Sequence, residues 1–405
     1  MTQISDSITL PCGASAKNRL FKSAMSEQLA DADHNPSGKL FKLYQTWAEG
    51  GIGICVSGNL MVDRNALGEP KNVVLDEQSN LDRFRDWASA ATQNGTEFWA
   101  QLNHPGKQIP NFLNKQPVAP SAIPLGNGLD KAFNCPRELT ENEIEAIIQR
   151  FATSAKLAQQ AGFTGIQIHS AHGYLVNQFL SPHHNRRTDR WGGPLENRMR
   201  FLMEIYHNIR KAVGDDFPVA IKLNSADFQK GGFSEEDFLL VVQELDKLGI
   251  DLIEVSGGNY ENPEMMGKES TAKREAFFID QASKARGVLK NTVLVVTGGF
   301  RSAKAMNQAL AEGVVDAIGI ARPLAVYPDL PNKLIADDDH SIRLKKLTTG
   351  SKTLDKFSMV DLVWYEHQMD RIGSGKRAKP NQSSWYSVLR NFKDIGSYAW
   401  KKRRA

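Results

Sequence analysis

The chain has 405 residues, 41% of them hydrophobic, and a formal net charge of +4, so it can bury a large core and gives little indication of a nucleic-acid partner. No apolar run approaches the roughly 20 residues that a membrane span needs. The polar start MTQISDSITLPCG has no signal-peptide core, so we expect a cytoplasmic protein. The three cysteines, Cys12, Cys55 and Cys135, lie far apart, which disfavours a disulfide framework, a zinc knuckle and an iron–sulfur cluster.

Short apolar runs that end in small or polar residues recur along the whole chain. They begin near Arg19, Ile52, Glu97, Thr164, Pro218, Ile250, Thr292 and Val315. Most are near-continuous apolar stretches, which is typical of strands buried on both faces of a parallel sheet. Helical patterns separate them: Thr140 and Glu143 form a capping box before one helix, and Ser234 and Asp237 mark the start of another.

The alternation of strands with helices predicts an α/β fold in which residues 1–330 form a single (β/α)8 TIM barrel. An open doubly wound sheet would carry a GxGxxG motif after an early strand, and the sequence has none. In a barrel of this kind, the residues at the C-terminal ends of the strands form the active site. Polar residues and glycines gather at those ends here, so we expect the site there.

Three long segments depart from the alternation. Residues 105–139 are rich in Pro, Gly and Asn and read as a long loop. Residues 259–277 follow the sixth strand, and we expect them to wall the active face as a lid or pocket side. Candidate substrate contacts in and beside this wall are Tyr260, Arg274, Phe277 and Phe278. Residues 331–405 form a predicted C-terminal helical extension.

The extension ends in a helical pattern that is both aromatic and basic. Trp385, Leu389 and Phe392 fall at helical spacing, ahead of the basic cluster at residues 401–404. The more common explanation is a helix that docks on the barrel or on another subunit, and we expect a homo-oligomer. The sharper alternative is a weak contact with an anionic membrane surface.

The stretch from residue 168 to residue 201 contains two histidines three positions apart. As metal ligands, His169 and His172 would need further partners. His183 or His184 could supply one, but no Asp or Glu stands in obvious register, so we expect no metal. Histidines that only pack are another alternative. Two donors aimed at one carbonyl oxygen would instead stabilise negative charge that develops there.

The same stretch reads H-x-x-H-G-Y-L-x-x-Q-F-L-S-P…N-x-R-x-D-x-W-G-G…E-N-R, a pattern that resembles the Old Yellow Enzyme family of flavin oxidoreductases. The resemblance covers about residues 8–330 and includes KNRLFKSAM, QLNHPGK, and the TGG and IAR segments after the last two strands. It implies a single-barrel, FMN-dependent ene-reductase without the iron–sulfur extension. Such an enzyme uses NADH or NADPH to reduce the activated C=C bond of small α,β-unsaturated carbonyl, nitro or dienoyl compounds.

The resemblance also implies roles for particular residues. His169 and His172 would hold the oxygen of the electron-withdrawing group. Tyr174 would protonate the α-carbon, although a buried tyrosine with a satisfied hydroxyl is a common alternative. The residues that would contact FMN all lie at or just after the C-terminal ends of strands: Ser23, Ala24, Met25, Ser26, Gly58, Gln101 and Lys222 at the ring system, and Gly298, Gly299, Ala321 and Arg322 at the phosphate.

Four of these positions depart from the family pattern. Ser26 replaces the usual cysteine or threonine, so redox control through a thiol is lost. Ala24 stands where many relatives have proline, and Ala321 stands where glycine is frequent. Lys222 replaces arginine and keeps the charge, but it loses the rigid fork of the guanidinium group.

Other functions compete with ene reduction. Lys222 could form a Schiff base, which would make the protein a lyase on a phosphate-binding barrel. Among flavoenzymes, amine oxidation or demethylation is the main rival, although relatives of that kind usually carry a cysteine-rich cluster that this chain lacks. A non-catalytic binding barrel would have no use for the set formed by His169, His172, Tyr174 and Gln101.

Overall fold

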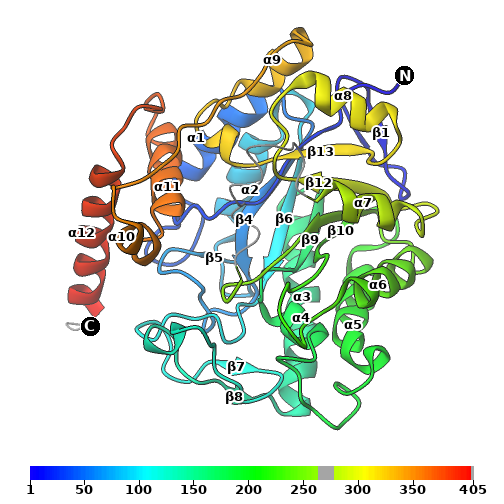
Figure 1. Cartoon of the computed structure of the whole chain (residues 1–405), viewed down its shortest axis with the longest axis vertical. Helices are drawn as coiled ribbons and strands as arrows, with labels where there is room; N and C mark the ends of the chain where they lie inside the picture. The colour runs from blue at the N-terminus through cyan, green and yellow to red at the C-terminus, as the bar shows by residue number, and fades with distance from the viewer. Residues whose placement is uncertain (263–277, 403–405) are drawn as a thin grey trace.

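Parallel strands form a closed barrel at the centre of the protein (Figure 1). The computed structural model describes residues 1–262 and 278–402, and every structural statement below concerns those residues. In order around the barrel, the eight strands are β3 (Leu20–Lys22), β4 (Ile54–Met61), β6 (Glu97–Asn103), β9 (Gly165–Ser170), β10 (Val219–Asn224), β11 (Leu252–Ser256), β12 (Val293–Thr297) and β13 (Ala317–Ile320). The last strand pairs with the first through Gly319 and Phe21, and Phe21 in turn pairs with Ile54 of β4. The prediction of a (β/α)8 barrel is confirmed.

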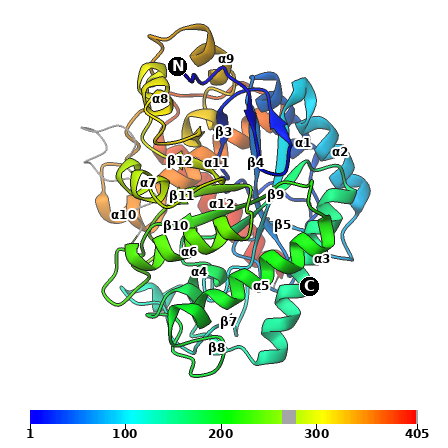
Figure 2. The ribbon, with the colours of Figure 1, turned by 90° about the vertical axis from the view of Figure 1, so that its right-hand side faces the viewer.

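Helices cover the outside of the barrel in both views (Figures 1 and 2). They are α1 (Gly38–Glu49), α2 (Leu81–Ala91), α3 (Glu141–Gln160), α5 (Leu195–Val213), α6 (Glu235–Lys247), α7 (Ile279–Arg286) and α8 (Ala303–Ala311). The capping box predicted before α3 is present. The Thr140 side chain accepts a hydrogen bond from the Glu143 N–H, and the Glu143 carboxylate accepts one from the Thr140 N–H. The Ser234 side chain caps α6 in the predicted way by accepting a hydrogen bond from the Asp237 N–H.

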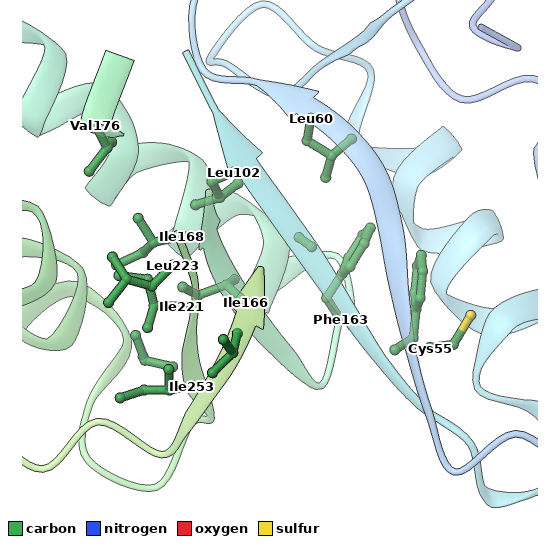
Figure 3. Close-up of a cluster of buried hydrophobic side chains, with 14 of the residues drawn as sticks. Cys55, Leu60, Leu102, Phe163, Ile166, Ile168, Val176, Ile221, Leu223 and Ile253 are labelled. Atoms are coloured by element: carbon green, nitrogen blue, oxygen red, sulfur yellow. The ribbon is translucent and has the colours of Figure 1, made fainter. Parts of the chain in front are cut away.

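The barrel strands carry apolar side chains on both faces, with a period of two residues. Ile166, Ile168, Ile221 and Leu223 belong to an outer cluster between the strands and the helices, part of which Figure 3 shows. Alternate positions on the strands form a second, inner cluster, which includes Phe21, Val56, Trp99, Ala220 and Leu252. Since neighbouring residues of a strand point to opposite faces, this second cluster fills the lower part of the barrel interior.

A short N-terminal hairpin closes the lower end of the barrel. It consists of β1 (Ile8–Thr9) paired antiparallel with β2 (Ser15–Ala16). Ile8, Leu10 and Ala16 belong to the same inner cluster as the strand residues. The lower interior is therefore packed with apolar side chains, and the polar residues of the interior lie toward the C-terminal ends of the strands.

Several segments after the strands add local structure at that upper end. β5 (Val73–Val74) pairs with the end of β4, and α4 (Leu175–Leu180) follows β9. The predicted loop at 105–139 contains a small parallel sheet of β7 (Val118–Ala119) and β8 (Arg137–Glu138). Of the predicted wall at 259–277, residues 263–277 lie outside the described residues, and so do the candidates Arg274 and Phe277.

The predicted C-terminal helical extension is present (Figure 1). It contains α9 (Leu330–Ala336), α10 (Lys352–Phe357), α11 (Val360–Gly373) and α12 (Ser384–Lys402). Trp364, Tyr365 and Met369 of α11 belong to the outer cluster of the barrel, and α11 packs against α1. Among the described residues, no helix combines the length and the apolar character that crossing a membrane would require.

Candidate active site

A chain of buried polar side chains crosses the upper interior of the barrel. Gln101 Nε2 donates to Gln167 Oε1 at 2.7 Å, and Gln167 Nε2 donates to Glu254 Oε2 at 2.8 Å. These residues lie on β6, β9 and β11. The side chain of Glu254 is 0% exposed. Burying a carboxylate raises the free energy of the folded state unless the group is paired and hydrogen-bonded. Its partners therefore fix the positions of the surrounding side chains.

Two more strands and the segment after β3 contribute to the same network. Lys222 Nζ on β10 lies 3.2 Å from Glu254 Oε1. Thr297 Oγ1 on β12 donates to the same oxygen at 2.7 Å. The hydroxyl groups of Thr297 and Ser23 are 2.5 Å apart, which brings in the segment after β3. Of the predicted cofactor residues, Ser23, Gln101 and Lys222 thus share one connected layer.

His169, His172 and Tyr174 lie together beside this layer, and His169 is in register with Lys222 of the neighbouring strand. The rings of His169 and His172 are 5.1 Å apart, and those of His169 and Tyr174 are 4.8 Å apart. His169 is the fifth residue of β9. His172 has a left-handed backbone (φ 61°), and its N–H donates to Asn224 Oδ1 on β10. The sharp turn after β9 is what brings three side chains from six residues of sequence to one place.

Hydrogen bonds fix which ring nitrogens can face a ligand. His169 Nδ1 accepts the Ala171 N–H at 3.3 Å, so a neutral His169 carries its proton on Nε2. His172 Nε2 lies 2.7 Å from Ser256 Oγ. Neither His169 Nε2 nor His172 Nδ1 has a hydrogen-bond partner in the part of the chain that the structure describes. Each histidine therefore has one ring nitrogen held by the protein and one available.

Burial keeps the titratable groups of this cluster neutral. It lowers the pKa of His172 to about 3, with a further contribution from the Lys222 charge. It also lowers the pKa of His169 well below its usual value, and His172 and Lys222 act in the same direction. Burial raises the pKa of Tyr174 well above its usual value. At neutral pH the cluster therefore consists of neutral imidazoles and a protonated phenol.

Of the two candidate substrate contacts beside the wall that the structure describes, Tyr260 and Phe278, only Tyr260 joins this cluster. Its hydroxyl lies 3.0 Å from the Tyr174 hydroxyl. Phe278 is 4% exposed and packs behind the backbone of β11, where a side chain on Gly257 would lie 2.8 Å from its ring. The structure therefore sets Phe278 against the backbone that follows β11, while Tyr260 reaches over the site.

In the segment after β3, Ser26 contacts two glutamates that no sequence motif predicts. Ser26 Oγ lies 2.6 Å from Glu69 Oε1 and 2.7 Å from Glu366 Oε1. Glu366 belongs to α11, in the C-terminal extension. Ser26, Gly58 and Asn59 also line a small pocket at this end of the barrel.

The glycines predicted to contact FMN differ in their surroundings. Gly298 and Gly299 follow β12 with φ values of 108° and 94°, and a side chain at Gly298 would meet nothing within 4 Å. This open backbone, next to Ala321 and Arg322 after the neighbouring strand β13, fits a phosphate group. A side chain at Gly58, in contrast, would lie 2.8 Å from the Met25 carbonyl oxygen. The absent side chain there makes room for the segment after β3. Ala24 of that segment packs on the inner cluster.

His183 and His184 form a group with Glu261 whose potential ligand atoms lie within 4.8 Å of one another. Lys107 Nζ, however, lies 2.8 Å from His184 Nδ1. An amino group held against a histidine opposes a cation at the same place. His169 and His172 do not take part in this group.

Gln167 and Glu254 are site residues that the sequence motifs do not single out, and Thr297, predicted only as part of the TGG segment at the phosphate, instead bonds to Glu254. Each is a polar residue at an interior position of an apolar strand, and a buried polar residue is an informative signal when a barrel is expected. Glu69 and Glu366 were also missed, and no local pattern around either one indicates its place.

The chain matches the sequence profile of the NADH:flavin oxidoreductase / NADH oxidase family over residues 12–339, so it belongs to this family. It is 38% identical over 372 residues to the NADH-dependent flavin oxidoreductase iliE of Hypocrea jecorina, a match that covers 84% of this chain and 92% of that protein. It is 39% identical over 355 residues to a protein of the same name from Neonectria sp., of which it spans 46%.

Solved structures agree with this assignment. An old yellow enzyme homologue from Zymomonas mobilis superposes with a TM-score of 0.71 and 26% identity over 86% of this chain and 95% of that one. A 2-naphthoyl-CoA reductase complex superposes with a TM-score of 0.77 and 29% identity over 82% of this chain and 52% of that one. The resemblance to the Old Yellow Enzyme family is confirmed. The family consists of oxidoreductases that use FMN with a nicotinamide reductant.

Proposed function

We propose that the protein reduces the activated C=C bond of small α,β-unsaturated carbonyl, nitro or dienoyl compounds, with NADH or NADPH as reductant. The observation that carries this proposal is the pair of neutral histidines, each with one ring nitrogen held by the protein and one available. His169 Nε2 is a donor, and His172 Nδ1 is a second donor when the Ser256 hydroxyl donates to His172 Nε2, so the pair suits a substrate oxygen on which negative charge develops during reduction. FMN, when bound, supplies the hydride that no protein side chain can carry.

The two tyrosines of the cluster are suited to the proton transfer that completes the reduction. Tyr174 keeps its proton through the neutral range because burial raises its pKa, so it is available as the general acid at the α-carbon. Tyr260 bonds to the Tyr174 hydroxyl and keeps it in place over the histidines. We expect Tyr174 to be more replaceable than the histidine pair, since other proton sources can reach a carbanion-like carbon.

The residues that we propose for FMN form a continuous path over the upper end of the barrel. Gln101 and Lys222 are fixed in the buried layer and suit the polar edge of the ring system, with Lys222 placed to offset negative charge on it. The segment from Ser23 to Ser26, together with Gly58, would lie along the ring. Gly298, Gly299, Ala321 and Arg322 would hold the phosphate, because Gly298 offers open backbone and Arg322 offers a cation.

Replacing both histidines tests the proposal. We expect His169→Ala with His172→Ala to lower the rate of enone reduction by about 10³-fold or more, because each lost donor typically costs 10² to 10³. The yellow colour of bound FMN should remain. Stopped-flow reoxidation of the reduced enzyme by an enone measures the effect. His207 is exposed on α5, so His207→Ala is a matched control. An unchanged rate in the double variant would rule out the carbonyl clamp.

The colour of the purified protein and the reoxidation experiment also separate the rival functions. A Schiff-base lyase needs a free amino group, whereas Lys222 is paired with Glu254 at 3.2 Å. A colourless purified protein would favour the lyase. An ene-reductase is reoxidised by enones, whereas an amine oxidase or demethylase has its flavin reduced by amines. Reoxidation of the reduced enzyme by enones, without reduction of the oxidised enzyme by amines, would therefore identify ene reduction.

We propose a cytoplasmic homo-oligomer that can also make a weak contact with anionic membrane surfaces. Three free cysteines support a reducing compartment. Support for the surface contact comes from α12, where Trp385, Tyr386, Leu389 and Phe392 are exposed and basic residues follow in the sequence.

A further inference from the structure

Ser26 joins two glutamates from distant parts of the chain. Glu69 lies between β4 and β5, and Glu366 lies on α11. Their Oε1 atoms are 2.6 and 2.7 Å from the same Ser26 Oγ. Gln28 also donates from Nε2 to both carboxyl oxygens of Glu366, at 3.0 and 3.1 Å, and it does so from a left-handed backbone with a φ of 51°. A non-glycine residue in this region is uncommon, and the Gln28 side chain reaches Glu366 from this conformation.

The number of protons in this arrangement is limited. A serine hydroxyl carries one proton and can donate to only one carboxyl group. Both contacts have the length of good O–H···O hydrogen bonds. The second contact therefore needs a proton that belongs to a carboxyl group, which donates to Ser26 Oγ. One of the two glutamates must be a neutral acid.

Glu366 is the better carrier of this proton. It is 6% exposed, and burial followed by the Glu69 charge raises its pKa to about 8, with Ser26 and Gln28 acting in the opposite direction. Burial also raises the pKa of Glu69. In the described part of the chain, neither glutamate forms an ion pair with a lysine or arginine. Among the described residues, two further titratable groups lie near the pair: the phenol of Tyr260 feels the Glu366 charge, and Glu27, whose pKa burial raises to about 7, feels the Glu69 charge.

The charge of this pair reaches the reaction centre. The Glu69 charge contributes to the raised pKa values of both Tyr174 and Tyr260, and the Glu366 charge contributes to that of Tyr260. Glu69 therefore lies close enough to the proposed general acid to alter its electrostatic environment, and Glu366 acts on Tyr260, whose hydroxyl lies 3.0 Å from that of Tyr174. Ser26 is one of the residues that we propose for flavin contact.

We propose that Glu366 is a positioning residue whose neutral carboxyl group donates to Ser26 Oγ, turns the Ser26 hydroxyl toward Glu69, and keeps a single negative charge beside the reaction centre. When Glu366 loses its proton, the hydrogen bond to Ser26 Oγ loses its donor and two carboxylates face each other. The second charge opposes the negative charge that develops on substrate and cofactor during reduction. The inference rests on the proposed function for this consequence, but the shared proton does not depend on it.

The pH profile of the holoenzyme tests the proposal. In the wild type we expect the rate of enone reduction to fall about tenfold for each pH unit above an inflection near 8, as the neutral acid is lost. Glu366→Gln keeps the size of the side chain and an N–H donor for Ser26. It should stay within a few-fold of the wild-type rate at neutral pH and lose the inflection. The midpoint potential of the bound FMN should change slope with pH at the same inflection in the wild type, and this change should be absent in Glu366→Gln.

A matched control lies one turn further along α11. The Asp370 carboxylate pairs with Lys39 and Arg390, hydrogen bonds from these two residues lower its pKa, and Asp370→Asn should therefore leave the inflection unchanged. Glu69→Gln should move the inflection to lower pH, because it removes the charge that helps keep Glu366 protonated.

Infrared spectroscopy supplies a readout that needs no turnover. A buried neutral carboxyl group gives a C=O stretching band that titrates near pH 8 and that Glu366→Gln should abolish. If the inflection persists in Glu366→Gln, or if the band is unchanged, the proposal is wrong. If no enone is reduced but the band titrates and disappears as expected, the shared proton stands and only the proposed reaction fails.

Discussion

Lys222 depends on a partner from a neighbouring strand. Its Nζ and the Glu254 carboxylate are 3.2 Å apart, with side chains 5% and 0% exposed. Neither charge can be solvated by bulk water at this depth. Removing one of them leaves the other buried without its counter-charge, which is far more costly than losing an exposed pair.

We therefore expect Lys222→Ala to lower the free energy of unfolding by about 3 kcal/mol and to weaken FMN retention. Chemical denaturation and the flavin absorbance of the purified protein measure the two effects. Lys247→Ala is the control, because Lys247 and its partner Glu244 are 67% and 40% exposed, and we expect a change below about 1 kcal/mol. Equal effects in the two variants would show that the buried pair contributes no more than a surface pair.

The residues of the site differ in how far the sequence predicts them. His169, His172 and Tyr174 are close in sequence, and a single turn after β9 brings them together, so a local motif suffices. Glu254 could be inferred only once the barrel and the inward-facing positions were known. Glu366 could not be inferred at all, because its place depends on how α11 packs against α1, which no local pattern encodes.

Among the elements, α3 begins with a cap that the sequence predicts and the structure contains. The Thr140 hydroxyl and the Glu143 carboxylate satisfy N–H groups that the first turn of a helix leaves free. The helix packs on α5 and against the barrel. A defect at its start should therefore reduce the stability of the fold without affecting the chemistry.

Thr140→Ala should lower the free energy of unfolding by about 1 kcal/mol and leave the kinetics of the FMN-loaded enzyme unchanged. Thermal or chemical denaturation measures the loss. Thr188 is exposed and caps no helix, so Thr188→Ala should have no measurable effect. A destabilisation shared by both variants would mean that the cap contributes nothing specific.

The long helices can be predicted from the sequence, whereas the two-residue strands cannot. α3, α6, α11 and α12 run over several turns, so their apolar spacing identifies them in the sequence. The strands β1, β2, β7 and β8 have two residues each. Two residues carry no alternation to recognise, and only the packing of the hairpin into the barrel or the pairing across the 105–139 loop defines them.

Over the whole molecule, large exposed apolar side chains gather on α12. Leu389 is 64% exposed, and Trp385 and Phe392 lie four residues before it and three after it. This spacing puts the three on one face of the helix. Val388 and Ser387 are buried against the protein, so the helix is docked on one side and open on the other.

Vesicle co-sedimentation tests the proposed surface contact. We expect Leu389→Glu with Phe392→Glu to lower binding to anionic vesicles by about tenfold or more, from the loss of buried apolar area and the added negative charge. Ile335 is 38% exposed on α9, and Ile335→Glu should leave binding unchanged. Binding that the double variant retains, or that neutral vesicles match, would contradict a basic and aromatic membrane contact.

The closure of the barrel also constrains how the protein can be made. β3 ends at Lys22, and one of its two neighbours is β13, which begins only at Ala317. A ribosome must therefore synthesise nearly the whole barrel before its first strand acquires both neighbours, and Ser26 meets Glu366 later still. Until then one edge of β3 has no strand to pair with, and an unpaired strand edge is prone to aggregation.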